Sequence, residues 1–126
     1  MPEKENTAKK TLVLGASSNP GRYSYMAVQK LREKQIPVTA VGNRHGYIGD
    51  VPIHTEPVAV EDIDTISLYL NAEKQVMYYD YILSLKPRRI LFNPGTENPE
   101  LEQRACQQGI ATLEACTLVL LGIGRY

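Results

Sequence analysis

Short β-prone apolar runs alternate with longer amphipathic segments along this chain. The runs lie at residues 11–15, 38–41, 65–70, 89–92 and 110–113. Strands that alternate with helices usually form a mostly parallel sheet joined by right-handed crossovers. The pattern therefore predicts an α/β, Rossmann-like doubly wound fold, with a five-stranded mostly parallel sheet and helices on both of its faces.

Three of the segments between the runs have the spacing and the end signals of helices. The first is expected to begin at about Gly21 and to end before Pro37, because proline disfavours helical geometry at the residue that precedes it. The other two are expected to follow the asparagine caps Asn71 and Asn98, and the last should end at Gly109. We therefore expect helices after the first, third and fourth strands.

Three segments lie outside this alternation. Residues 44–64 are predicted as a loop rich in turn residues, with a hairpin-like excursion over 46–53. The tail from Leu118 to Tyr126 is apolar, and we expect it to cover the sheet edge or a neighbouring subunit, the latter in a homodimer. Residues 1–9 are interpreted as a flexible N-terminal tail before one domain over residues 10–126.

Composition and charge narrow the class of function. A chain of 126 residues is large enough for one domain with one core. Fourteen basic and fourteen acidic side chains cancel, so the net charge indicates neither a nucleic acid nor a membrane surface as partner. Two cysteines are too few for a disulfide framework and lack metal-ligand spacing. With no apolar run of membrane-spanning length and no signal peptide, a cytoplasmic protein without a metal site is expected.

The segment from Thr11 to Arg22 carries the most specific chemistry. A strand, a turn of small residues that begins at Gly15, and a helix follow one another there. This order directs free backbone N–H groups and the positive end of a helix at one point, where phosphates can approach the main chain closely. The dinucleotide fingerprint is absent, because Ser17 and Pro20 stand where it requires glycine. The loop therefore predicts a phosphate cradle for a nucleotide or a nucleotide-like cofactor.

Four strand ends share a second property. Each of the segments 15–18, 42–44, 69–71 and 93–96 contains small or amide-bearing residues where a structural turn could have carried Asp or Lys. Ligands of open parallel sheets bind at the carboxyl ends of the strands, where the strand order reverses. We therefore expect these four strand ends to form one binding site.

In this order, the four strand ends resemble the CoA-binding domain family, a Rossmann-like module that also forms the amino-terminal domain of the succinyl-CoA synthetase α subunit. Small bacterial members typically open with a Gly-Ala-Ser loop followed by Pro, Arg and Ser, and have a glycine turn after strand four. They also have a cysteine after strand five. The matching residues here are Gly15, Ala16, Ser17, Pro20, Arg22, Ser24, Val41, Asn43, Asn93, Pro94, Gly95 and Cys116. Arg44 stands where the family has Pro-Lys, and Glu114-Ala115 where it has Asp-Arg.

This resemblance implies roles for individual residues. Residues 17–19 would bind the pyrophosphate, and Arg22 would pair with a phosphate. Residues 43–44 would lie beside the ribose or its 3′-phosphate, 69–71 would line the adenine and pantetheine path, and 95–96 would flank its far end. The cofactor-binding residues implied are Gly15, Ala16, Ser17, Ser18, Asn19, Arg22, Ser24, Asn43, Arg44, Tyr69, Leu70, Asn71, Asn93, Gly95 and Thr96.

A catalytic constellation is missing from the sequence. It has no Ser–His–Asp pattern with local support, no carboxylate pair beside the cradle and no Tyr-x-x-x-Lys. We therefore expect non-catalytic binding of CoA or acyl-CoA, as a sensor or regulatory module. The alternative is an NADP(H)-binding oxidoreductase or a remnant of one, because Arg44 stands where a 2′-phosphate would need a cation. A scaffold that binds no nucleotide is a third, lesser reading.

Overall fold

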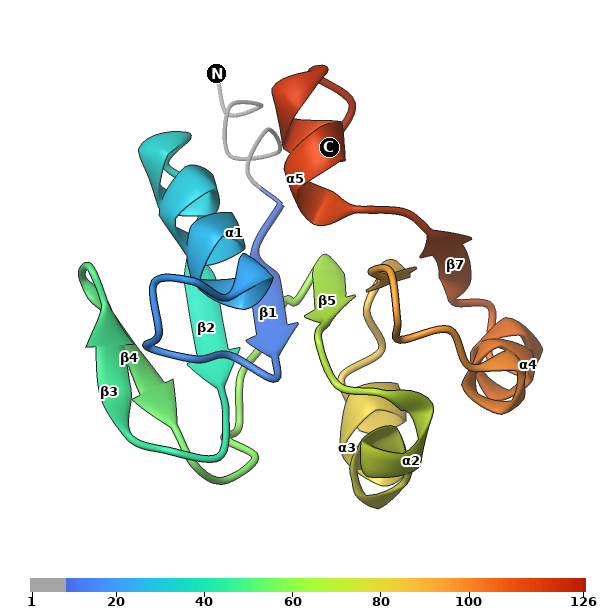
Figure 1. Cartoon of the computed structure of the whole chain (residues 1–126). Helices are drawn as coiled ribbons and strands as arrows, with labels where there is room; N and C mark the ends of the chain where they lie inside the picture. Colours follow the sequence, from blue (N-terminus) through green and yellow to red (C-terminus); the bar gives the residue numbers. More distant parts are fainter. Residues whose placement is uncertain (1–8) are drawn as a thin grey trace.

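Seven strands form one sheet in residues 9–126, the part of the chain that the computed structural model describes (Figure 1). Their order across the sheet is β3-β4-β2-β1-β5-β6-β7. The strands are β1 (Thr11–Leu14), β2 (Val38–Val41), β3 (Gly46–Ile48), β4 (Val51–His54), β5 (Thr65–Leu68), β6 (Arg89–Phe92) and β7 (Ala111–Glu114).

The five strands predicted from the sequence correspond to β1, β2, β5, β6 and β7, and each pairs in parallel with its neighbours. The predicted count of five is wrong, because the hairpin over residues 46–53 joins the sheet. Its second strand, β4, pairs in parallel with β2, while β3 is antiparallel to β4. Ile48, Val51 and Ile53 are buried, so the hairpin extends the core beyond β2.

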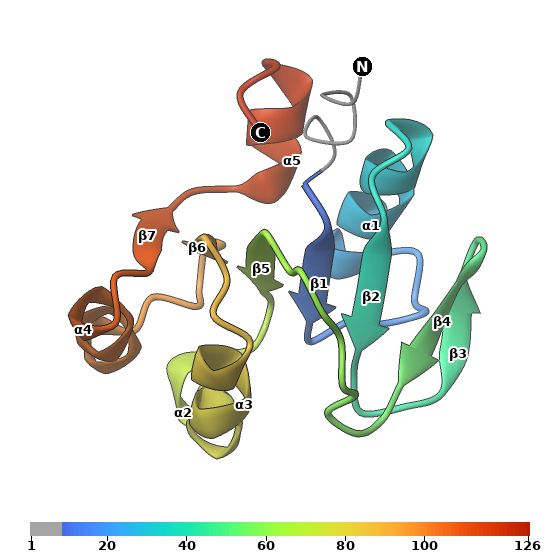
Figure 2. The same cartoon turned by 180° about the vertical axis from the view of Figure 1, so that it is seen from behind.

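Helices cover both faces of the sheet (Figures 1 and 2). One face carries α1 (Tyr23–Glu33) and α5 (Thr117–Gly122), and the other carries α2 (Ala72–Gln75), α3 (Tyr79–Ser84) and α4 (Pro99–Gln107). A 3₁₀ turn, η2 (Val76–Tyr78), joins α2 to α3, so the second predicted helix is interrupted. No helix within residues 9–126 is long and apolar enough to cross a membrane.

Alternate residues of β1 face two separate cores. Leu12 and Leu14 pack with Ile82 of α3 and Leu101 of α4, whereas Val13 packs with α1 and α5. Leu12, Val13 and Leu14 are fully buried, and burial of a side chain of this size contributes about 1.5–3 kcal/mol. Since β1 is anchored on both faces, the position of its carboxyl end is fixed.

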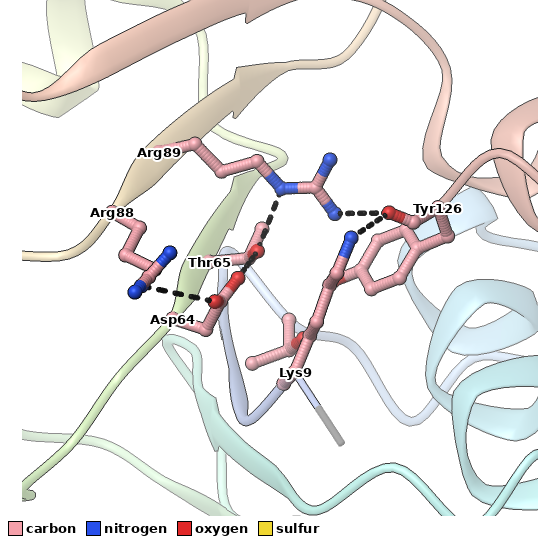
Figure 3. Close-up of polar contacts among 7 residues, drawn as sticks. Lys9, Asp64, Thr65, Arg88, Arg89 and Tyr126 are labelled. Carbon is pink, nitrogen blue, oxygen red and sulfur yellow. Dashed lines mark hydrogen bonds and ion pairs between the residues drawn. The ribbon is translucent and has the colours of Figure 1, made fainter. Parts of the chain in front are cut away.

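The last residues of the chain return to the amino end of β1 (Figure 3). The Tyr126 hydroxyl shares a hydrogen bond with Thr11 Oγ1, and the Arg89 guanidinium lies 4.5 Å from the centroid of the Tyr126 ring. Lys9 and Arg89 both donate to the main-chain oxygen of Tyr126, at 2.6 and 3.0 Å. The apolar tail thus packs as α5 on its own sheet beside α1 rather than at the sheet edge, with Leu121 buried. A homodimer through this tail stays a prediction.

Candidate functional site

The chain reverses its direction across the sheet between β1 and β5. From β1 it crosses through α1 to β2 on one side, and from β5 it crosses through α2 and α3 to β6 on the other. The two connections lie on opposite faces, so they diverge at the carboxyl ends of these central strands (Figure 1). In doubly wound folds this divergence opens the crevice in which ligands bind.

Two neighbouring hollows of about 460 Å³ each lie at this edge, and we call them together the groove. Both are lined by Gly15, Ser17, Arg22 and Tyr69. The β6-side hollow is also lined by Gly21, Tyr23, Ser24, Asn71, Pro94, Gly95 and Thr96. The β2-side hollow is also lined by Ala16, Gly42, Asn43, Leu70, Lys74, Met77 and Tyr78.

Most of the predicted cofactor-binding residues line this groove. Those that do are Gly15, Ala16, Ser17, Arg22, Ser24, Asn43, Tyr69, Leu70, Asn71, Gly95 and Thr96. Four others lie outside both linings: Ser18, Asn19, Arg44 and Asn93. Gly42 and Pro94 also line the groove and belong to the strand ends that were expected to form the site, although they were not among the predicted cofactor-binding residues. Lining residues that the sequence reasoning missed are Gly21, Tyr23, Lys74, Met77 and Tyr78. Whether any of these residues contacts a ligand stays a prediction.

Gly15 is required by the packing of the backbone. Its φ of +98° lies in the left-handed region, and a Cβ there would stand 2.9 Å from the carbonyl carbon of Tyr69. At the neighbouring strand end, a Cβ on Gly42 would stand 2.1 Å from the carbonyl oxygen of Ala16. The two glycines therefore let the ends of β1, β2 and β5 approach one another closely. The sequence reasoning assigned this freedom at Gly15 to a ligand instead.

The loop between β1 and α1 is held by its own polar groups. Asn19 Oδ1 accepts from the N–H of Gly21 at 2.9 Å, and the N–H of Asn19 donates to Ser17 Oγ at 3.1 Å. The N–H of Arg22 donates to the Asn19 carbonyl at 3.0 Å, which closes the turn directly before α1. Ser18 lies beside β3, next to Gly46. Asn19 thus shapes the cradle from outside the groove.

The start of α1 offers free hydrogen-bond donors to the groove. Within residues 9–126, the N–H groups of Tyr23 and Ser24 have no acceptor, and Arg22 at the N-cap position provides no side-chain cap. The first N–H groups of a helix, together with the helix dipole, favour an anion. Arg22 also forms no ion pair with any residue that the structure describes. An anion in the groove would therefore meet a guanidinium and unsatisfied amides together.

The groove is positively charged overall. Its lining contains two cationic side chains, Arg22 and Lys74, and no Asp or Glu. Glu97, which follows the turn after β6, lies outside both linings, and its carboxylate accepts from the N–H of Gly95 at 3.1 and 3.2 Å. Without a carboxylate among the lining residues, the charges of Arg22 and Lys74 remain available to a negatively charged ligand.

Asn93 builds the floor of the site instead of lining it. Its side chain is buried, and its Nδ2 donates to Ser67 Oγ at 2.9 Å and to the Leu68 carbonyl at 2.8 Å. Its Oδ1 accepts from the N–H of Thr117 at 2.8 Å. The amide thus joins β5, β6 and the start of α5 with all of these bonds inside the fold. It positions the Pro94–Gly95–Thr96 wall of the groove.

Gln75 is a positioning residue that the sequence reasoning missed. It is fully buried, and its Nε2 donates to the carbonyls of Leu70 and Thr96 at 2.7 and 2.8 Å. Its Oε1 accepts from Asn98 Nδ2 at 2.8 Å. One side chain therefore joins the end of β5 to the turn after β6 and to the cap of α4. A glutamine within a charged helical turn gives no signal of burial in the sequence.

Tyr69 is one of the four residues that line both hollows. Burial raises the pKa of its hydroxyl to about 12, so the side chain is neutral around pH 7. A general acid or base needs a pKa close to the working pH, and Tyr69 does not meet that condition. Within residues 9–126, no group of three or more His, Cys, Asp or Glu side chains could hold a metal ion.

Comparison with known proteins gives a family and a fold. Residues 9–122 match the family model described as CoA binding domain. A solved structure described as an uncharacterized protein is 43% identical, with a TM-score of 0.92, and the match covers 94% of this chain and 98% of that one. No curated protein matches the chain.

Two more distant structures support the fold alone. A Thermus thermophilus protein described as cell-free ID.343 is 21% identical, with a TM-score of 0.83 and full coverage of both chains. A hypothetical protein from Pyrococcus horikoshii OT3 is 19% identical, with a TM-score of 0.80 and coverage of 93% and 84%. Since the family model spans nearly all of the described residues, this chain belongs to the CoA-binding domain family.

Proposed function

We propose that the chain binds CoA or an acyl-CoA in the groove and acts as a non-catalytic sensor or regulatory module. The observation that carries this proposal is the chemistry of the lining. Two cations without ion pairs among the described residues and the free N–H groups at the start of α1 meet in one groove that no carboxylate lines. CoA carries its negative charge on phosphates, which such donors favour.

The proposed ligand follows the groove from one hollow to the other. The pyrophosphate lies at the start of α1 beside Arg22, which both hollows share. The adenosine lies in the β2-side hollow, where Leu70, Met77 and Tyr78 offer apolar and aromatic surface. The pantetheine and any acyl group extend into the β6-side hollow toward Gly95. In this placement the ligand spans the carboxyl ends of β2, β1, β5 and β6.

The NADP alternative has less support from the arrangement of the groove. It depended on Arg44, which lines neither hollow. Tyr69, which lines both hollows, is also unsuited to act as a general acid or base near pH 7, since burial raises its pKa to about 12. We therefore keep NADP as a comparison ligand in the experiment below.

Isothermal titration with CoA, acetyl-CoA, NADP and NAD, after removal of any copurified ligand, tests the proposal. We expect CoA or acetyl-CoA to bind with a Kd of about micromolar order, and no heat of binding from NADP or NAD. NADP binding without CoA would support the oxidoreductase alternative, and the absence of binding by all four would contradict the proposed ligand.

The variant Arg22→Gln tests where the phosphates bind. Loss of a hydrogen bond to a charged group costs about 1.5–3 kcal/mol, so we expect the Kd for CoA to rise by about ten- to hundredfold. Arg88→Gln is the matched control, because Arg88 is exposed just before the amino end of β6, at the opposite edge of the sheet. An unchanged Kd for Arg22→Gln would mean that the pyrophosphate lies elsewhere.

A further inference from the structure

Lys74 provides a second positive charge in the groove, at a different point from Arg22. It lines only the β2-side hollow, together with Asn43, whereas Arg22 lines both hollows. Within the described part of the chain, the Lys74 side chain has no ion pair. The groove therefore presents two separate sites of positive charge along its length.

The backbone that carries Lys74 is held from both sides. Its N–H donates to Asn71, to Oδ1 at 2.9 Å and to the carbonyl at 3.1 Å. The next residue, Gln75, is fully buried and is joined to the carbonyls of Leu70 and Thr96. These contacts fix the backbone of Lys74 beside the β2-side hollow, which Lys74 lines.

The β2-side hollow is the place for a ribose. In doubly wound sheets the ribose of a nucleotide lies near the end of the second strand, which here contributes Gly42 and Asn43. A 3′-phosphate on that ribose would add a charge of about −2 to this hollow, at some distance from the pyrophosphate. Arg44, the cation that directly follows in the sequence, is exposed and lies outside the lining. Lys74 is therefore the cation suited to this phosphate.

Resting on the proposed function, we propose that Lys74 is a specificity-determining residue that selects ligands with a ribose 3′-phosphate. Lys74 would make the chain bind CoA more tightly than dephospho-CoA, which has the same adenine, pyrophosphate and pantetheine but lacks this phosphate. A lysine ammonium acts as a compact point charge on a flexible stem, so its contribution depends on the charge of its partner. Arg22 interacts with the pyrophosphate, which both ligands carry, and so does not distinguish them.

The experiment measures the Kd of CoA and of dephospho-CoA for the wild-type chain and for Lys74→Gln. We expect the wild type to prefer CoA, and Lys74→Gln to weaken CoA binding by about tenfold while dephospho-CoA stays within about twofold. Lys74→Arg keeps the charge and is expected to keep the preference. Lys34→Gln, at the exposed C-cap of α1 and outside both hollows, is the matched control and should change neither Kd.

The outcomes separate this inference from the proposed function. If the wild type binds neither ligand, the proposed function is wrong and this inference falls with it. If the wild type binds both ligands, and Lys74→Gln either weakens the binding of both equally or changes the binding of neither, CoA binding stands and the role of Lys74 is overturned. Arg22→Gln provides the internal comparison, because it should weaken both ligands to the same extent.

Discussion

Asn93 and Arg22 both follow strands at the carboxyl edge of the sheet, and the sequence marks both as candidates. The Asn93 amide makes three hydrogen bonds inside the fold, whereas the Arg22 side chain makes none with the described residues and lines the groove. In the sequence Asn93 is simply a polar residue directly after an apolar run, and Arg22 is a polar residue after a turn of small residues. Strand-end position can therefore be predicted from sequence, but whether a side chain supports the fold or faces a ligand depends on partners from distant segments.

Gly15→Ala is expected to destabilise the fold because of backbone crowding. The new Cβ would meet the Tyr69 backbone at 2.9 Å in a residue whose φ is +98°, so we expect a loss of about 2–4 kcal/mol in the free energy of unfolding. Gly95→Ala is the matched control, since its φ is +92° and nothing lies within 4 Å of a Cβ there. It should cost about 1 kcal/mol, from backbone strain alone. Urea unfolding measures both, and equal losses would contradict the argument from crowding.

At the scale of elements, the alternation of short apolar runs with helices led to the five parallel strands correctly. The sequence reasoning left the hairpin over residues 46–53 outside the sheet. In the structure β4 pairs with only two residues of β2, Ala40 and Val41, and so short a pairing leaves no pattern in the sequence. It also missed the break at η2, since apolar residues three to four apart are compatible with either a continuous helix or one interrupted by a single 3₁₀ turn. Short pairings and single turns are decided by tertiary contacts, which local patterns do not contain.

The cap of α4 should contribute more stability than the cap of α2. Asn98 is buried; its Oδ1 accepts from the N–H groups of Glu100 and Leu101, and its Nδ2 donates to Gln75 and Tyr79. Asn98→Ala removes the cap and leaves the buried Gln75 Oε1 without its donor, so we expect a loss of about 2–3 kcal/mol.

Asn71→Ala is the control for this prediction. Asn71 is also an N-cap, but it is exposed and accepts one side-chain hydrogen bond, so its loss should cost about 1 kcal/mol or less. Chemical denaturation of the two variants gives the comparison. A smaller loss for Asn98→Ala than for Asn71→Ala would show that the buried network around Gln75 adds little to stability.

At the scale of the whole molecule, three partly buried tyrosines make the stability sensitive to alkaline pH. Burial raises the pKa of Tyr69 to about 12 and also raises the pKa of Tyr81 and Tyr126. An unfolded tyrosine loses its proton near pH 10, whereas folded Tyr69 keeps it until about pH 12. Its contribution is therefore fully present below about pH 10 and is lost as the pH rises to about 12.

We expect this loss to amount to roughly 2 kcal/mol for Tyr69 alone. The free energy of unfolding is measured in urea at about pH 9 and about pH 11.5, for the wild type, Tyr69→Phe and Tyr47→Phe. Tyr69→Phe should show the smaller decrease with pH, because it has no proton to lose. Tyr47 is 69% exposed, so Tyr47→Phe should follow the wild type. Identical decreases in all three proteins would contradict the role of Tyr69.

The walls of the groove come from both sides of the sheet: Arg22, Tyr23 and Ser24 lie at the start of α1, and Lys74, Met77 and Tyr78 belong to α2 and η2 on the opposite face. A molecule that fills the groove would therefore contact elements on both faces of the sheet and link the two hydrophobic cores through its own contacts. At a hundred times its Kd it would stabilise the folded chain by about 2.7 kcal/mol, a shift of several degrees in Tm. The affinities of a panel of acyl thioesters could then be ranked by the melting temperature of the protein alone. On binding, amide hydrogen exchange should slow in α1 and in α2 together.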